Sequence, residues 1–270
     1  MMHRTIHCEA IDHHIELPEN PERIISLLPS ATEALFHMGL VDRVVGVSEY
    51  CSRYVPDLAA PQVGQYLNCD LKKIHSLKPD LILTTGGIQR NLAAKLAAEG
   101  LPIFILPLPQ SFYGILENID ILGGLVNQLE TARTLTAKMN QRAAELQNRA
   151  PVHRPSVYLE LWLGRHMRAV GGGSFIRDLI HLAGGDLVYK NKSTGYFTPD
   201  FDEVAALSPD VHLFFHEPEY LIDPAELIDQ RNWNAATKTI ISTVLCGENV
   251  IQDGPSFLDT AEWLHHQLVS

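Results

Sequence analysis

The clearest pattern in the sequence is an apolar stripe in its middle, within residues 127–150. Apolar side chains recur there at spacings of three and four residues: Leu129, Ala132, Leu135, Met139, Ala143 and Leu146. This spacing predicts one amphipathic helix. Asn127, with Glu130 three residues later, is typical of an N-cap and its capping-box partner. Without a glycine or proline to interrupt it, such a helix spans roughly 33 Å and can link two domains.

Short apolar runs and amphipathic stretches alternate on both sides of this helix. The run 23–28 is short and largely apolar, which is typical of a strand buried on both faces of a parallel sheet, and a further strand is expected at 156–161. The connections are short, so the pattern predicts βαβ units. The stretch 5–18 alternates instead, and we expect a hairpin there. The sequence therefore indicates the α/β fold class with mostly parallel sheets.

An internal repeat indicates two lobes rather than one large domain. Residues 70–83 and 200–213 align without a gap, and both predict a short helix that stops at a proline and leads into a buried strand. The sequence thus predicts an N-terminal α/β lobe at 1–126 that includes the hairpin, a linking helix at 127–150 and a C-terminal α/β lobe at 151–270. Ligands of parallel sheets bind beyond the carboxyl ends of strands, so we expect a site in a cleft between the lobes.

Aromatic residues gather in the loops expected at these strand ends: Tyr50, Tyr66, Trp162, Tyr196, Phe197 and Tyr220. Aromatic side chains supply a large contact area at little entropy cost, which suits a large, flat, partly apolar ligand. The alternative for any one of them is packing within its own lobe.

Charge and cysteine content limit the classes of function that the chain can have. The chain has 32 acidic and 21 basic residues, a net charge of −11, which argues against surfaces for nucleic acid or anionic membranes. Its four cysteines lack zinc-site spacing and are interpreted as free thiols, with a disulfide framework as the weaker alternative. The first residues hold no apolar segment of the signal-peptide type, so a native start predicts a cytoplasmic protein. The other interpretation is the mature part of an exported protein.

Few residues suggest metal or enzyme chemistry. Of thirteen histidines, only His216, beside Glu217 at an expected strand end, is retained as a possible axial ligand to cobalt or iron, and no resident metal site is predicted. The loop 171–173 could place helix amides around a phosphate, but it lacks the lysine of a nucleotide-binding loop. No motif pairs a nucleophile with a base, so we predict that the chain is not an enzyme.

Several segments carry a resemblance to a known family: RIISLLPSATEALFHMGLVDRVVGVSEY, YLELWLGRHMRAVGGGSFIRDLIHLAGGDL and GPSFLDTAEWLHHQL. The chain resembles the substrate-binding proteins of cobalamin and iron-siderophore ABC importers, most closely the cobalamin branch. The resemblance implies the class III periplasmic-binding-protein architecture, with two Rossmann-like lobes joined by one backbone helix. It also implies limited closure, a monomer without catalysis, a periplasmic or extracytoplasmic location and an ABC permease as partner.

The resemblance and the strand-end positions together give a set of candidate ligand-binding residues: Tyr50, Tyr66, Gly86, Gly87, Trp162, Tyr196, Phe197, His216 and Glu217. The expected ligand is a corrinoid, either cobalamin or a precursor. A ferric siderophore or haem is the alternative, since Arg53, Arg165 and Lys192 could meet anionic groups. An enzyme with a Rossmann-like half is the third, less favoured hypothesis.

The resemblance also implies positions that contact the permease. Members of the family often carry an acidic residue on each lobe for this purpose. The second lobe here has Asp202 and Glu203, whereas the equivalent first-lobe position is Lys72. We therefore expect altered docking on a standard permease.

Overall fold

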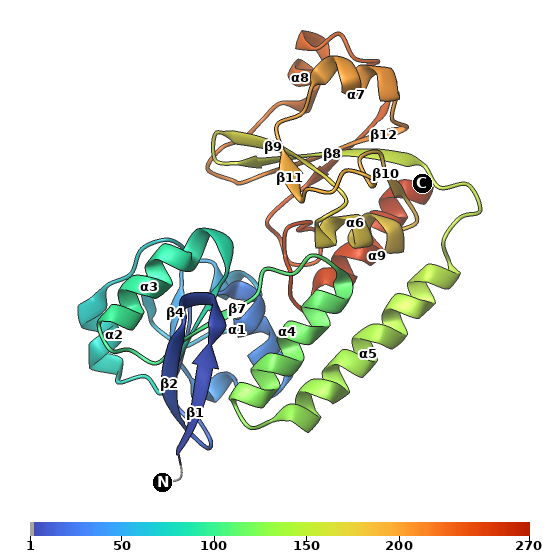
Figure 1. Cartoon of the computed structure of the whole chain (residues 1–270). Helices are drawn as coiled ribbons and strands as arrows, with labels where there is room; N and C mark the ends of the chain where they lie inside the picture. The colour runs from blue at the N-terminus through green and yellow to red at the C-terminus, as the bar shows by residue number, and fades with distance from the viewer. Residues whose placement is uncertain (1–2) are drawn as a thin grey trace. The chain divides into compact units, whose positions relative to one another are not determined.

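The computed structural model describes residues 3–270 (Figure 1). The chain forms two compact units. The first holds the residues up to Leu108 together with Tyr113–Met139, and the second holds Pro109–Phe112 together with Asn140–Ser270. Helix α5 (Leu129–Asn148) contributes to both units. Within residues 3–270, every helix is too short or too polar to cross a membrane.

The first unit is built on a sheet of five parallel strands in the order β5-β4-β3-β6-β7. Its strands are β3 (Ile24–Ser26), β4 (Val44–Ser48), β5 (Gln62–Gly64), β6 (Leu81–Thr85) and β7 (Ile103–Leu106). Its helices are α1 (Pro29–His37), α2 (Leu71–Leu77), α3 (Arg90–Ala98) and, from its second residue on, α4 (Phe112–Leu125). Short 3-10 turns lie at Glu9–Ile11, Val41–Arg43, Cys51–Arg53 and Gly87–Gln89. The predicted parallel sheet is confirmed.

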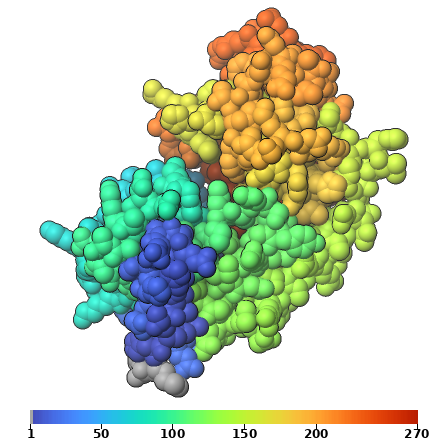
Figure 2. Space-filling view, viewed as in Figure 1, coloured from blue at the N-terminus to red at the C-terminus, as the bar shows by residue number. Residues whose placement is uncertain are grey.

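The N-terminal hairpin is also confirmed. Strands β1 (His3–Cys8) and β2 (His13–Pro18) pair antiparallel. The hairpin forms part of the surface of the first unit (Figure 2). Its inward side chain Cys8 joins the apolar core beneath α2 and α3, which also holds Ile74 and Leu96. The hairpin therefore extends the cover on this face of the sheet.

The turn between α4 and α5 differs from the sequence expectation. The predicted N-cap Asn127 lies instead in a left-handed turn (φ 56°), and α5 begins at Leu129. The turn is tight because Gly123 of α4 packs directly on α5. A Cβ atom at Gly123 would lie 2.4 Å from the Cβ of Ala132, closer than two carbon atoms can approach. Side chain Arg4 caps the end of α4 by donating to Gly124 O at 2.8 Å.

The second unit has a mixed sheet in the order β11-β9-β8-β12-β13, with β10 also paired to β8. Its strands are β8 (Ser156–Leu163), β9 (His166–Val170), β10 (Asp186–Leu187), β11 (Tyr196–Phe197), β12 (Val211–His216) and β13 (Lys238–Ser242). The pairs of β8 with β10 and β12, and of β12 with β13, are parallel, whereas β9 runs antiparallel to β8 and β11. Its helices are α6 (Phe175–Leu182), α7 (Phe201–Leu207), α8 (Pro224–Gln230) and α9 (Phe257–Val269).

The two copies of the predicted repeat form the same capping hydrogen bonds. Asp70 accepts from the first-turn amides of α2, and Asp200 does the same for α7. Both helices end on a left-handed residue with φ 46°, Lys78 in the first unit and Ser208 in the second. The same local sequence therefore builds the same helix twice.

A second aspartate of the repeat anchors the neighbouring strand in each unit. Asp80 accepts from the amide of Arg23, just before β3, at 3.0 Å. Asp210 accepts from the amide of Ser156, at the start of β8, at 2.7 Å. Hydrogen bonds from Ser156 hold the pKa of Asp210 below its usual value. The shared Asp80 and Asp210 thus fix which strand pairs with β6 and with β12.

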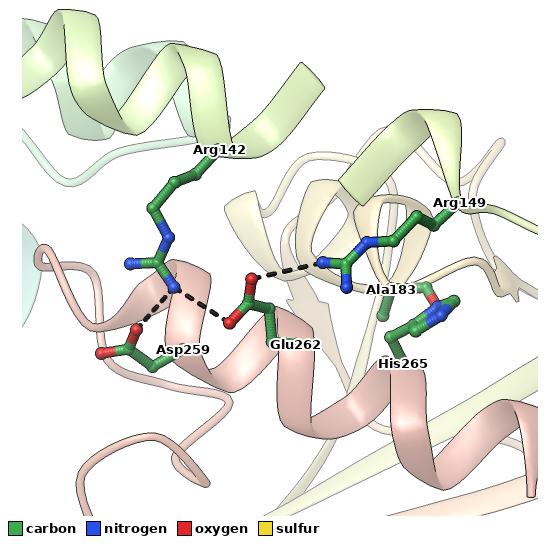
Figure 3. A network of polar contacts seen from close by, with 6 residues as sticks. All are labelled: Arg142, Arg149, Ala183, Asp259, Glu262 and His265. Carbon is green, nitrogen blue, oxygen red and sulfur yellow. Dashed lines mark hydrogen bonds and ion pairs between the residues drawn. The ribbon is translucent and has the colours of Figure 1, made fainter. Parts of the chain in front are cut away.

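Within the second unit, the last turns of α5 are tied to α9 by ion pairs (Figure 3). Arg142 reaches Asp259 at 2.7 Å and Glu262 at 3.2 Å, and Arg149 reaches Glu262 at 3.2 Å. These side chains are partly exposed, so each pair contributes at most about 1 kcal/mol. As a network they fix the rotation of this half of α5 on α9.

Candidate ligand-binding site

The first unit brings two of the predicted aromatic residues together. Tyr50 follows β4 and Tyr66 follows β5, and their ring centroids lie 6.1 Å apart. The guanidinium carbon of Arg53 lies 4.4 Å from the Tyr50 ring, a cation–π contact. Both tyrosines are half-buried. They form a partly exposed aromatic surface at the carboxyl end of the sheet.

A buried glutamine, which sequence reasoning missed, holds this end of the sheet. Gln89 accepts from the amide of Thr85 at 2.9 Å and donates to Leu27 O at 3.0 Å and to Tyr66 O at 2.7 Å. Its side chain therefore connects the ends of β3 and β6 to the loop that carries Tyr66. Leu27 is 62 residues away in the sequence, so no local spacing marks this role.

The loop after β6 contains the predicted pair Gly86 and Gly87. Gly87 has φ +69°, a backbone conformation that favours glycine. Gly86 donates its amide to Leu106 O at 2.9 Å, which fixes the loop beside the end of β7. Two exposed apolar side chains, Ile88 (66% exposed) and Leu108 (48%), belong to the same strand-end loops and were not singled out from the sequence.

The second unit places Trp162 and His216 side by side. They are register partners at the ends of the parallel strands β8 and β12. The Nδ1 atom of His216 lies 3.2 Å from Glu217 O. The carboxylate of Glu217 accepts from the amide of Gly164 at 2.6 Å, in the turn between β8 and β9. Glu217 thus fastens this turn to the loop after β12.

A buried ionic network lies directly beneath Trp162. Its indole Nε1 donates to Glu160 Oε1 at 2.8 Å. Arg231 forms a two-pronged ion pair with the same carboxylate at 2.8 and 3.1 Å, and Tyr158 donates its hydroxyl at 2.8 Å. The Glu160 side chain is 0% exposed and that of Arg231 is 8% exposed. Burial and the nearby carboxylate raise the pKa of Tyr158, so its hydroxyl stays a donor.

Tyr196 and Phe197 lie apart from this pair. They form the edge strand β11, which is separated from β8 by β9, and Phe197 is level with Glu160 rather than with Trp162. The ring of Phe197 packs edge-on against Tyr189 at 4.9 Å, within the apolar core of this unit. The position of β9 between β8 and β11 was not predicted, because a short antiparallel strand leaves the alternation of strands and helices along the chain unchanged.

The amides of the glycine loop at 171–173 form hydrogen bonds within the chain. Amides Gly171, Gly172 and Gly173 donate to the carbonyls of Gly195, Lys192 and Thr194 at 2.8–3.1 Å. A Cβ at Gly172 would lie 2.0 Å from Lys190 O. These glycines permit two backbone segments to pack closely, and the phosphate-binding alternative has no available amides there.

Comparison with known proteins places the chain in a family. The family model described as periplasmic binding protein matches residues 24–240. The chain belongs to the periplasmic binding protein family. A relative from Halobacterium salinarum, named cobalamin-binding protein, is 29% identical over 202 residues, which cover 73% of this chain. The chain spans 54% of that relative's length.

Solved structures of periplasmic binding proteins share the fold. The periplasmic vitamin B12-binding protein of Vibrio cholerae is 25% identical, with a TM-score of 0.70 over 92% of this chain and 97% of that chain. The periplasmic haem-binding protein of the same organism is 20% identical, with a TM-score of 0.78 over 94% of this chain and all of that chain. These findings confirm the predicted resemblance and the α/β periplasmic-binding-protein fold. The family is one of substrate-binding proteins rather than enzymes, in agreement with the prediction that the chain has no catalytic activity.

The predicted permease contacts lie at equivalent places in the two units of this periplasmic binding protein. Lys72 is exposed in the first turn of α2, and Asp202 and Glu203 are exposed in the first turn of α7. The Glu203 carboxylate also accepts from the hydroxyl of Tyr189 at 3.3 Å. The difference in charge therefore lies on one matched helix turn.

The remaining candidate chemistry is sparse in the described part of the chain. Within residues 3–270, no three histidine, cysteine or acidic side chains are placed to hold a metal ion. The four cysteines are thiols rather than members of a disulfide framework, and Cys8 and Cys51 are buried. Burial raises the pKa of Cys51, which makes it a poor nucleophile at neutral pH.

Proposed function

We propose that the chain binds a corrinoid, cobalamin or a precursor, and delivers it to an ABC importer outside the cytoplasm. Tyr50 and Tyr66 of the first unit and Trp162 and His216 of the second are proposed to supply the contacts. The observation that carries the proposal is that each sheet carries two ring side chains at its carboxyl edge, in a family with cobalamin-binding relatives.

The chemistry of these residues suits a macrocycle. Aromatic rings contact a flat ring system through dispersion and apolar burial, at low entropic cost. A corrinoid carries mainly neutral amide groups at its rim, so it does not require a set of basic residues. Gly86 and Gly87 have no side chains, so a ligand can approach the backbone of the loop after β6 closely.

Haem or a ferric siderophore is the second candidate. Both kinds of ligand carry anionic groups, and Arg53 is held at the Tyr50 ring, where it could meet one. Lys192, by contrast, lies 4.1 Å from the Phe197 ring on the edge strand, away from Trp162. The periplasmic haem-binding protein of Vibrio cholerae shares the fold at 20% identity, so fold likeness does not separate these ligands.

A visible absorption spectrum tests the proposal. The protein is mixed in turn with cyanocobalamin, cobinamide and haemin and then freed of unbound ligand by gel filtration. We expect a corrinoid spectrum to remain with the protein in stoichiometric amount. Retention of haemin alone would contradict the corrinoid assignment and favour the second candidate.

A further inference from the structure

We propose that Glu160 positions Trp162 for the ligand and accepts its only hydrogen bond, so that Trp162 has no donor left for a ligand. This inference rests on the proposed function, since it assigns Trp162 to the ligand. Glu160 itself is buried and is not proposed to touch the ligand.

Strand geometry places the two side chains in contact. Glu160 and Trp162 are two residues apart in β8, so their side chains lie on the same face of the sheet. The indole Nε1 donates to Glu160 Oε1 at 2.8 Å. Trp162 is half-buried at the strand end, whereas Glu160 lies one step deeper and is fully buried. The deeper residue therefore determines how the outer ring is turned.

The carboxylate is held by other groups, so it is a fixed reference point. Each of its oxygens accepts two hydrogen bonds, from Trp162 and Arg231 at Oε1 and from Tyr158 and Arg231 at Oε2. The guanidinium of Arg231 is itself enclosed by aromatic faces, at 4.0 Å from the Phe201 ring and 4.8 Å from the Trp233 ring. A charged acceptor gives a stronger hydrogen bond than a neutral one.

This arrangement has a consequence for recognition. Indole has a single donor and no acceptor, and in Trp162 that donor is already used. Trp162 can therefore contribute stacking and apolar contact but no hydrogen bond to a ligand. Turning the ring over would break the bond to Glu160 and leave a buried charge with an unfilled acceptor position, which is costly. The ring is thus ordered before the ligand arrives, which lowers the entropic cost of binding.

The ligand class follows from this constraint. A ring that offers only its apolar surface favours a flat, extended ligand such as a corrin or porphyrin macrocycle. It disfavours small polar ligands that depend on hydrogen bonds to the protein.

A double-mutant cycle tests the positioning role. Glu160→Gln should weaken cyanocobalamin binding about tenfold, because it removes a charged acceptor beneath the ring. In a Trp162→Phe background the same change should alter affinity less than about twofold, because phenylalanine has no donor for Glu160 to hold. Tyr158→Phe is the matched control, since Tyr158 donates to Oε2 of the same carboxylate whereas Trp162 donates to Oε1. Equal weakening by Glu160→Gln in both backgrounds would overturn the proposal. If wild-type protein binds haemin instead, the cycle is run with haemin.

Hydrogen exchange of the indole N–H tests the same idea without a ligand. The Trp162 indole signal in a nitrogen-15 correlation spectrum should exchange slowly in wild type and at least about tenfold faster in Glu160→Gln. The signal of Trp263, which lies on α9, should stay unchanged. Unaltered exchange at Trp162 would overturn the positioning role. If Glu160→Gln does not fold, Glu160→Asp withdraws the carboxylate from the ring while keeping its charge. If the wild-type protein binds no corrinoid but the indole of Trp162 exchanges as predicted, only the proposed function is refuted.

Discussion

At the scale of single residues, burial in the second unit decides what a side chain can do. His212 on β12 is 3% exposed and stacks on Trp233, with ring centroids 4.8 Å apart. Burial, with the nearby Arg231 charge, lowers the pKa of His212 to about 4. In the sequence, His212 is one of thirteen histidines. Its contact with Trp233 and Arg231 could not be predicted, because these two residues come from another segment of the chain.

This lowered pKa predicts a loss of stability in acid. Above about pH 6.5, His212 is neutral in both the folded and the unfolded chain and has no effect on the pH dependence. Between about pH 6.5 and 4, only the unfolded chain gains a proton, so the free energy of unfolding falls as the pH falls, by up to roughly 3 kcal/mol. His212→Phe should flatten this slope in urea unfolding measured across that range. The exposed His266→Gln is the control and should keep the wild-type slope; an unchanged slope in His212→Phe would contradict the account.

The aromatic contacts make a second prediction at this scale. Tyr50→Ala and Trp162→Ala should each weaken cyanocobalamin binding by roughly 1–3 kcal/mol, the loss expected when a ring no longer buries apolar ligand surface. Isothermal titration provides the measurement, with Tyr113→Ala, an exposed tyrosine on α4, as control. Wild-type affinity in both site variants would remove these rings from the ligand site.

At the scale of elements, sequence patterns predicted most helices and strands because their periodicity is local. The repeat 70–83 and 200–213 was recoverable since its aspartate caps and left-handed ends are all encoded within fourteen residues. Helix α4 was not predicted, because it contains three glycines, Gly114, Gly123 and Gly124, which disfavour a helix. Its partner Arg4 lies 120 residues away. The candidate site was predicted at the strand ends, as at Tyr50 and Trp162. It was missed at Gln89 and Glu160, because each depends on a partner far away in the sequence, Leu27 for Gln89 and Arg231 for Glu160.

The adjacent glycines at the end of α4 give a matched pair of substitutions. Gly123→Ala should lower the free energy of unfolding by about 1–3 kcal/mol, because its methyl group would collide with Ala132 of α5. Gly124→Ala meets nothing within 4 Å and should raise stability by about 0.5–1 kcal/mol, since alanine favours a helix. Urea denaturation measures both. The interpretation fails if the two variants change stability in the same direction.

At the scale of the whole molecule, the two units present matched helix turns of opposite charge. The chain carries Lys72 on α2 where α7 carries Asp202 and Glu203. We propose that both turns contact a permease, as the family resemblance implies. A permease with basic groups for an acidic residue of each unit would then face the positive charge of Lys72 at α2. Such contacts between like charges cost several kcal/mol.

Lys72→Glu should therefore strengthen the association with a standard cobalamin permease reconstituted in vesicles. Lys95→Glu on α3 is the control, because it makes the same change of charge on another exposed helix. Ligand-stimulated ATP hydrolysis by the importer gives the readout. If the wild-type protein already stimulates fully and Lys72→Glu has no effect, Lys72 is only a solvated helix residue.

The central claim is that this periplasmic binding protein holds a corrinoid. Isothermal titration of the wild-type protein with cyanocobalamin, in parallel with haemin and a ferric hydroxamate siderophore, tests it most directly. We predict saturable binding of one cyanocobalamin per chain, at least about tenfold tighter than either iron ligand, a difference of about 1.4 kcal/mol. Saturable binding of haemin or the siderophore without measurable binding of cyanocobalamin would contradict it.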